Sequence, residues 1–283
     1  MPSIGDFHLH STFSDGTLAP AELLDLAVRN GVRYLALTDH DSTEGLPAMR
    51  AALGGHPGVV LVAGVELSCD IPGDEVHVLG YFLDEHDTHV QERLRRLRDG
   101  RVRRAERMVE KLNALGLPIT WERVLQIANG AAVGRPHIAQ ALLESDAIAT
   151  LNEAFERYIG RNGPAYVERD RMLPAEAVRF IREAGGVTSL AHPSYVRQLA
   201  TVLPEMVEAG LDGIEVYYKQ YDGDQISHFK TLADRYRLVA TGGSDYHGLP
   251  RGDEREPGDI PFPDLAVHRF VELGERAVAR AGR

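Results

Sequence analysis

Histidines and acidic residues are the most informative feature of this sequence, which has twelve histidines among 283 residues. They recur in short motifs along the chain. The candidate ligands are His8, His10, Asp15, His40, Glu66, His77, His192, Asp245 and His247. Imidazole nitrogens combined with carboxylate oxygens suit zinc, manganese or iron, whereas calcium prefers more oxygens. The residue types therefore predict a transition-metal site.

The spacing of these residues indicates a shared site, although each residue alone says little. A single histidine at the end of a strand is more often a hydrogen-bonded structural residue than a ligand. His8 and His10 are stronger candidates, because side chains at i and i+2 of a strand point to the same side. Clustered carboxylates would also repel one another without cations between them. We therefore expect the set to act together.

Seven short apolar runs, mostly separated by helical patterns, must position these residues. We predict strands at 4–9, 34–38, 59–65, 76–82, 187–191, 213–217 and 238–241. This alternation is typical of a parallel α/β structure, either an open sheet or a closed barrel. In such folds the loops after the strands open on one face, where the candidate ligands should converge.

Residues from about 88 to 163 interrupt this alternation. They show helical periodicity at 90–115, 120–128 and 151–159, a further helix opened by Pro136, and no convincing strand. We predict a helical insert between the fourth and fifth strands. The expected organisation is a main domain formed by residues 1–87 and 164–283, interrupted by the insert at 88–163.

Composition and charge exclude several classes of binding partner and cellular location. Lys and Arg total 31 against 42 Asp and Glu, and the formal charge of −11 argues against stable binding of long nucleic acid or an anionic membrane. No apolar run approaches the ~20 residues of a membrane span, and the N-terminus lacks a secretory pattern. Cys69, the single cysteine, cannot form an internal disulfide. We expect a cytoplasmic protein without a membrane partner.

Ordered motifs run over about 1–85 and 165–250: D-F-H-L-H-S-T-F-S-D-G, L-T-D-H-D, G-V-E-L-S, His77, A-H-P and G-S-D-Y-H. On these motifs the chain resembles the PHP (polymerase and histidinol phosphatase) family of metal-dependent phosphoesterases. The resemblance implies a distorted seven-stranded (β/α)7 barrel with an all-helical insert. It also implies two to three divalent ions, with Mn2+ expected before Zn2+ or Fe2+.

The resemblance further implies how the ligands divide among three metals. The first would bind His8, His10, Glu66 and Asp245; the second would share Glu66 and add His77 and His192; the third would bind Asp15, His40 and His247. Glu66, Asp15, His40 and His192 would act in catalysis through the metals and a bridging hydroxide. Asp39 is interpreted as a carboxylate that orients an imidazole.

Candidate substrate contacts lie mainly in the insert, whose G-R-P-H-I-A motif resembles the subgroup that acts on nucleotides and short RNA. Gly134, Arg135 and His137 stand at the start of the helix opened by Pro136, where anions bind well. An arginine-rich run, 93–107, is interpreted mainly as a solvated helix face, with Arg104 chosen to face the site. Lys219, after the sixth strand, is a weaker candidate.

We therefore expect a phosphoric monoester hydrolase that removes the 3′-phosphate of nucleoside 3′,5′-bisphosphates and leaves the nucleoside 5′-monophosphate. The insert would serve as a lid and bind the second phosphate. The alternatives are a 5′–3′ exoribonuclease acting on short RNA, a histidinol phosphate phosphatase, and a non-catalytic PHP module associated with a polymerase. An amidohydrolase would rest on barrel analogy alone.

Overall fold

A single sheet of seven strands organises the structure, a computed structural model that describes residues 2–168, 172–219, 221–249 and 254–282. In chain order the strands are β1 (Gly5–Leu9), β2 (Tyr34–Leu37), β3 (Val60–Ile71), β4 (Asp74–Tyr81), β5 (Val187–Leu190), β6 (Gly213–Tyr218) and β7 (Val239–Gly243). The chain after β7 returns to β1, where the His10 amide donates to the Tyr246 carbonyl at 3.0 Å. The predicted distorted seven-stranded barrel is confirmed.

The strands are not all parallel, and that part of the prediction is wrong. β4 runs antiparallel to both β3 and β5. β3 continues to Ile71, well beyond the predicted end at residue 65, and Gly73, with φ +80°, turns the chain directly into β4. Glu66 therefore lies within β3 rather than after it. Because β4 runs backwards, its first half lies level with the carboxyl ends of the parallel strands, and His77 pairs with Ser68 there.

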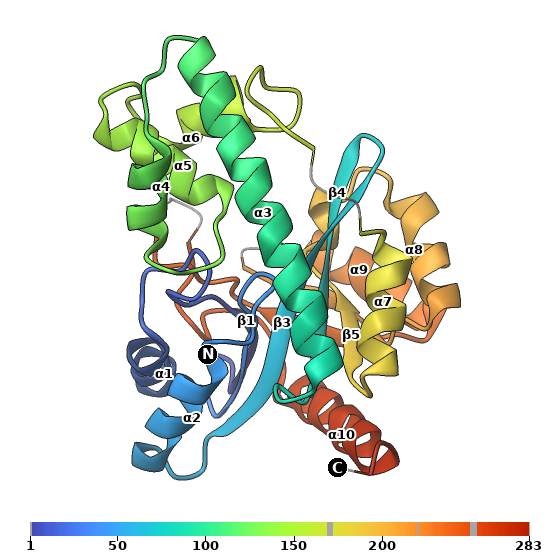
Figure 1. The fold of residues 1–283 in the computed structure, drawn as a ribbon. Coiled ribbons are helices and arrows are strands. Elements are labelled where there is room, and N and C mark those ends of the chain that lie inside the picture. Colours follow the sequence, from blue (N-terminus) through green and yellow to red (C-terminus); the bar gives the residue numbers. More distant parts are fainter. Residues whose placement is uncertain (1, 169–171, 220, 250–253, 283) are drawn as a thin grey trace.

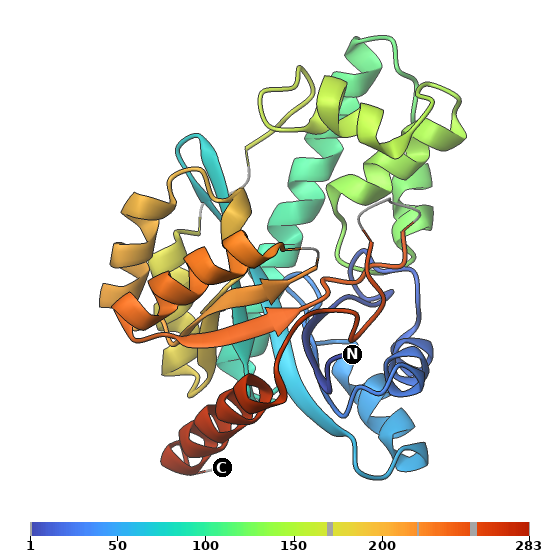
Figure 2. The same ribbon diagram turned by 180° about the vertical axis from the view of Figure 1, so that it is seen from behind.

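Helices cover the outside of the barrel and close its lower end (Figures 1 and 2). They are α1 (Pro20–Arg29), α2 (Leu46–Ala52), α7 (Pro174–Glu183), α8 (Leu199–Ala209), α9 (Gly223–Tyr236) and α10 (Asp264–Arg280). α10 seals the barrel interior, since the rings of Phe270 and Phe7 lie 4.5 Å apart between centroids. The sequence patterns do not predict α8, which contains Pro204, a residue that normally argues against a helix interior.

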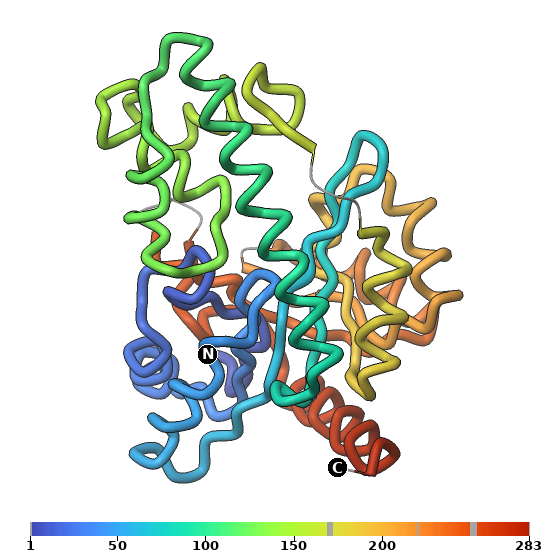
Figure 3. The backbone as a smooth tube through the Cα atoms, viewed as in Figure 1, coloured from blue at the N-terminus to red at the C-terminus, as the bar shows by residue number. Residues whose placement is uncertain are grey.

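Between β4 and β5 the chain forms a helical layer above the barrel mouth (Figures 1 and 3). Its elements are α3 (Thr88–Ala114), α4 (Trp121–Ala128), α5 (Arg135–Glu144), α6 (Leu151–Ala154) and the π-helical turn Phe155–Ile159. α3 belongs to two cores: Val90 and Leu94 pack with the barrel, whereas Met108 and Leu112 pack with α4 and α5. No helix among the described residues is both long and apolar enough to cross a membrane.

Candidate metal centre

The predicted ligands gather at the barrel mouth, beneath the helical layer. His8 and His10, at the end of β1, are fully buried. The others come from β3, β4 and the loops that follow β1, β2, β5 and β7. Most of them line a cavity of about 180 Å³ that opens above the two buried histidines. The antiparallel β4 still contributes His77 to this mouth, because its first half lies there.

One group of ligand atoms surrounds a point at the base of the cavity. The Nε2 atoms of His8 and His10 lie 3.4 and 3.2 Å from Glu66 Oε2. Each also lies 3.2 Å from Asp245 Oδ1. Two imidazole nitrogens and two carboxylate oxygens, all within 4.8 Å of one another, form a donor set for a transition metal.

Glu66 connects this group to a second one. Its other oxygen, Oε1, lies 2.7 Å from His77 Nδ1 and 3.2 Å from His192 Nε2. Oε2 also lies 3.0 Å from His40 Nδ1. One buried carboxylate therefore meets histidines from several strands, as a carboxylate that bridges two ions would.

The third group lies on the side of the loop after β1. Asp15 stands 3.3 Å from His247 Nε2 and 3.7 Å from His40 Nε2. His10 also belongs to this group, because its Nδ1 lies 3.9 Å from Asp15 Oδ1. The structure thus places all predicted ligands in adjoining groups and adds neighbours to two of them: His40 to the second and His10 to the third.

Buried polar atoms at the centre fit metal ions. His8 Nε2, His10 Nε2 and Glu66 Oε2 are buried without a hydrogen-bond partner among the described residues, a rare condition in folded proteins. Burial alone would lower the pKa of His10, but contacts with Asp245 and Glu66 raise it to about 10. Burial alone would likewise lower the pKa of His77, but contacts with the Glu66 carboxylate raise it to about 9. The carboxylates thus require positive charge at the centre, which divalent ions would supply.

Glu215 is a residue of this site that the sequence analysis missed. It lies in β6, fully buried, and its Oε1 is 3.0 Å from His8 Nδ1. Its Oε2 accepts a hydrogen bond of 2.6 Å from the His192 backbone amide. A carboxylate that holds the second nitrogen of a ligand histidine fixes its tautomer and orientation. The only signal in the sequence is an acidic residue inside an otherwise apolar strand.

Asp39 acts on the loop after β1 and, through the Ser14 hydroxyl, on one imidazole, since that hydroxyl lies 3.4 Å from His10 Nδ1. Its carboxylate accepts hydrogen bonds from the Ser11 amide, the Ser11 hydroxyl and the Ser14 hydroxyl, at 2.8, 2.7 and 2.6 Å. These bonds organise the loop that carries Asp15. Asp39 therefore shapes the backbone around the site instead of holding an imidazole directly.

Backbone strain also occurs at this site. His192, Lys219, Asp41 and Asp245 have φ values of +29°, +34°, +50° and +50°, although none is glycine. Such conformations cost about 1–3 kcal/mol each and persist where the surrounding structure enforces them, often at functional sites. The turns that carry His192 and Asp245 are therefore held in place by the fold.

Comparison with known proteins agrees with this geometry. A family model of the PHP domain matches residues 6–159, which include His8, His10, His40, Glu66 and His77. The chain belongs to the PHP family.

Proteins with different named activities are similar to this chain. It is 33% identical over 274 residues to a 3′,5′-nucleoside bisphosphate phosphatase from Chromobacterium violaceum, an alignment that covers 94% of this chain and 96% of the relative. It is also 33% identical to the 5′-3′ exoribonuclease Rnm of Salmonella typhimurium, over 86% of this chain and 85% of that one. A crystal structure from Bifidobacterium adolescentis, assigned as a metal-dependent phosphoesterase, superposes with a TM-score of 0.84 at 32% identity, covering 97% and 98% of the two chains.

Arginines of α3 form one wall of the cavity lined by the candidate metal ligands, here called the metal cavity. Arg104 is buried and lines the cavity, and its Nε donates to the Val167 carbonyl at 2.7 Å. Arg101, which the sequence analysis did not single out, also lines the cavity and donates to the Ser68 hydroxyl at 2.7 Å while pairing with Asp41. Outward-facing arginines such as Arg95 pair with acidic neighbours on the exposed face, as interpreted from the sequence.

The G-R-P-H segment forms the start of α5, as predicted, but its members face different spaces. Gly134 and Arg135 line the metal cavity, where Arg135 donates to Glu75 at 2.8 Å. His137 Nδ1 accepts a 3.0 Å hydrogen bond from the Gly134 amide, so His137 caps its own helix. Burial also lowers the pKa of the His137 imidazole below its ordinary value. His137 is thus a neutral imidazole on the wall of a neighbouring pocket.

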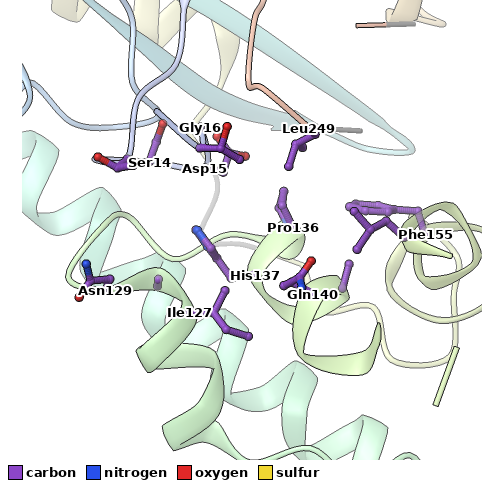
Figure 4. Close-up of a pocket in the computed structure, with 15 residues that line it drawn as sticks. Ser14, Asp15, Gly16, Ile127, Asn129, Pro136, His137, Gln140, Phe155 and Leu249 are labelled. Atoms are coloured by element: carbon purple, nitrogen blue, oxygen red, sulfur yellow. The ribbon is translucent and has the colours of Figure 1, made fainter. Parts of the chain in front are cut away.

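That neighbouring pocket has a volume of about 340 Å³ (Figure 4). The loop with Ser14 and Asp15 forms one side, and Ile127 and His137 of the helical layer form the other. Most of its lining is apolar, and Gln140 adds a polar edge. The pocket adjoins the metal cavity, because Asp15, Pro136 and Phe155 line both.

Lys219 does not line the cavity in the described structure. Its ammonium group lies 3.0 Å from Asp245 Oδ2, which also accepts a 2.7 Å hydrogen bond from the Tyr218 hydroxyl. Lys219 and Tyr218 therefore fix one oxygen of Asp245, and the other oxygen faces the histidines. Positioning of a ligand, rather than substrate contact, follows from this geometry.

Proposed function

We propose that this protein is a metal-dependent phosphoesterase that hydrolyses the 3′-phosphate of nucleoside 3′,5′-bisphosphates. The products are the nucleoside 5′-monophosphate and phosphate. One observation carries the proposal: the ligand cluster opens into a cavity walled by arginines, and that cavity adjoins a pocket of nucleoside size, with Asp15, Pro136 and Phe155 lining both.

The metal sites follow the three groups described above. His8, His10, Glu66 and Asp245 would hold one ion, Glu66 with His77 and His192 a second, and Asp15 with His40 and His247 a third, with Mn2+ as the expected metal. Bound together, such ions lower the pKa of a water molecule and stabilise negative charge on phosphate oxygens. The protein contributes fixed donors, buried from bulk water and oriented by Glu215 and Lys219.

The second phosphate would bind on the helical layer. Arg135 stands at the N-terminus of α5, where anions bind well, and Arg101 and Arg104 lie on the wall formed by α3. One guanidinium group can bind two phosphate oxygens at once through two parallel hydrogen bonds. Holding a phosphate away from the reacting one orients the substrate, which can lower the barrier by several kcal/mol in favourable cases.

The apolar pocket would take the nucleobase. Its volume of about 340 Å³ accommodates a planar heterocycle, Phe155 and Pro136 offer apolar surfaces, and Gln140 can hydrogen-bond a base edge. We also propose that the helical layer, residues 88–163, acts as the lid over the site. It contributes one wall of each space and packs around its own core, so it can present these walls as a unit.

Substrate comparison tests the function. The Mn2+-loaded protein should hydrolyse adenosine 3′,5′-bisphosphate with a kcat/KM at least tenfold above that for adenosine 3′-monophosphate and above that for histidinol phosphate. Chromatography should identify adenosine 5′-monophosphate and phosphate as products. Glu66→Gln is the inactive control. Preference for histidinol phosphate, or release of the 5′-phosphate, would refute the proposal.

A further inference from the structure

The turn after β7, residues 245–248 and here called the His247 turn, carries two of the candidate metal ligands and is bent sharply at both ends. Asp245 and Gly248 have φ values of +50° and +73°, and only the glycine adopts such a value without steric cost. A Cβ at Gly248 would also clash with the Thr17 hydroxyl. A turn of this kind keeps its shape only where other parts of the chain hold its backbone.

The backbone of this turn decides where the His247 imidazole points. His247 Nδ1 lies 2.9 Å from the Asp245 carbonyl oxygen, which can only accept a hydrogen bond, so Nδ1 carries the proton. The lone pair is therefore on Nε2, which lies 3.3 Å from Asp15 in the third ligand group. His8 differs, because its second nitrogen contacts the side chain of Glu215. Since the His247 ring is anchored to its own turn, a change in the turn would move the ligand atom.

Thr17 holds the carbonyl side of the turn. Its amide and its hydroxyl donate to the His247 carbonyl at 2.8 and 3.0 Å, and the hydroxyl also lies 3.2 Å from the Gly248 carbonyl oxygen. Thr17 stands in the loop after β1, close in the chain to Asp15. These bonds therefore join the two loops that supply Asp15 and His247.

Glu254 holds the amide side of the same turn. A single oxygen, Oε1, accepts from the His247 amide at 2.6 Å and from the Gly248 amide at 2.7 Å. Two successive N–H groups that converge on one point form a nest for an anion, and here a carboxylate of the same chain fills it. Such charge-assisted hydrogen bonds are about twice as strong as neutral ones. Among the described residues, Glu254 belongs to none of the three ligand groups and does not line the metal cavity.

We propose that Glu254 is a positioning residue for the third metal group, and that the affinity of this group for a divalent ion depends on its carboxylate. The carboxylate keeps the His247 turn in the shape that aims Nε2 at Asp15. The inference rests on the metal centre of the proposed function and is independent of the choice of substrate.

The effect should be confined to the third group. Asp245 belongs to the first group and stands at the start of the same turn, but its Oδ2 is fixed separately by the Tyr218 hydroxyl at 2.7 Å and by Lys219 at 3.0 Å. The ligands of the second group come from other elements. Loss of Glu254 should therefore weaken one metal site and leave the others unchanged.

Titration of the metal-free protein with Mn2+ tests this role without any substrate. Electron paramagnetic resonance measures the free ion, and His247→Asn identifies the binding step that belongs to the third group. Glu254→Ala should weaken that step about tenfold, a loss typical of removing a group that supports a ligand, and leave the other steps unchanged. Glu254→Gln keeps an oxygen that can accept from both amides and should lose less.

Two further variants separate the turn from charge and from folding. Thr17→Val removes the hydroxyl bonds on the opposite side of the turn at nearly constant volume, and it should weaken the same step even if Glu254→Ala does not fold. Glu256→Ala is the matched control, because it removes the same charge from the same segment. Glu256 is exposed and accepts from the Asn30 amide at 3.1 Å, so its variant should bind Mn2+ as the unmodified protein does.

The outcomes distinguish this inference from the function on which it rests. An unchanged third step in Glu254→Ala, an equal weakening of all steps, or the same loss in Glu256→Ala would overturn the inference, as would the absence of any step sensitive to His247→Asn. The expected Mn2+ binding without turnover of adenosine 3′,5′-bisphosphate would refute the proposed function and leave the inference standing. Absence of Mn2+ binding in the unmodified protein would refute both.

Discussion

Arg135→Ala should reveal whether the substrate carries a second phosphate on the helical layer. The Arg135 guanidinium, 20% exposed, lies at the cavity wall. A hydrogen bond from such a charged group to phosphate contributes about 1.5–3 kcal/mol, which corresponds to a loss of about 10- to 150-fold in kcat/KM. The loss should appear with adenosine 3′,5′-bisphosphate and not with p-nitrophenyl phosphate, which has only the reacting phosphate. Steady-state kinetics with both substrates measures the difference.

Glu75 complicates this experiment and must be controlled. Arg135 neutralises Glu75 at 2.8 Å, and Glu75 in turn lies 3.4 Å from His77 Nε2. Removing the arginine would leave the Glu75 carboxylate in the cavity without this cation, and the carboxylate would itself repel phosphate. The double variant Arg135→Ala/Glu75→Gln removes that charge and should still lose bisphosphate turnover selectively. Arg123→Ala, an exposed arginine paired with Glu144, serves as the matched control.

Two results would refute the reasoning. Equal losses on both substrates would mean that Arg135 acts through Glu75 on His77, and therefore on the reaction centre. Recovery of bisphosphate turnover in the double variant would mean that the charge of the Glu75 carboxylate, and not a missing phosphate contact, caused the loss.

The remaining predictions concern the metals and the pocket. Glu66→Gln should abolish hydrolysis and reduce the bound metal measured by elemental analysis, because one carboxylate serves two groups; full metal content would contradict the bridging role. Glu215→Ala should weaken metal affinity about 10- to 100-fold in competition titrations, and unchanged affinity would show that His8 needs no such support. A chelator should lower the melting temperature as well as activity, since ions that bind only the folded chain stabilise it; an unchanged melting curve would argue against resident metals. Ile127→Trp should fill the apolar pocket and raise KM for nucleotides more than tenfold with normal metal content, whereas Leu125→Trp on the exposed face of α4 should not.

Much of the metal cluster can be predicted from the sequence, because the signals are local. His8 and His10 share a side of one strand, and Asp245 and His247 stand in one loop, so spacing alone indicates that they act in pairs. The prediction that strand ends converge brings the remaining ligands to the same place. Glu215 could not be predicted in this way, because its partner His8 is 207 residues away in the chain and no residue next to Glu215 indicates a site.

Other features depend on packing that the sequence pattern does not contain. α3 carries arginines on several sides, and only its contact with the barrel decides that Arg101 and Arg104 face the cavity while Arg95 faces solvent. The direction of β4 did have a local signal, the Pro72-Gly73 pair between two apolar runs, which favours a hairpin over a crossover.

In the proposed function, the groups that bind the metals are separate from the groups that choose the substrate. The candidate ligands stand on strands and strained turns of the barrel, whereas the proposed nucleobase pocket and phosphate contacts come mainly from helices with their own core. α3 joins the two parts, since Val90 anchors it in the barrel and Arg101 reaches Ser68 beside the ligands. Under the proposed function, changes in the helical layer would alter the substrate without disturbing the metal ligands. The chain is 33% identical both to a phosphatase and to an exoribonuclease, so the residues lining the cavity and the adjoining pocket, and not overall identity, must decide the substrate.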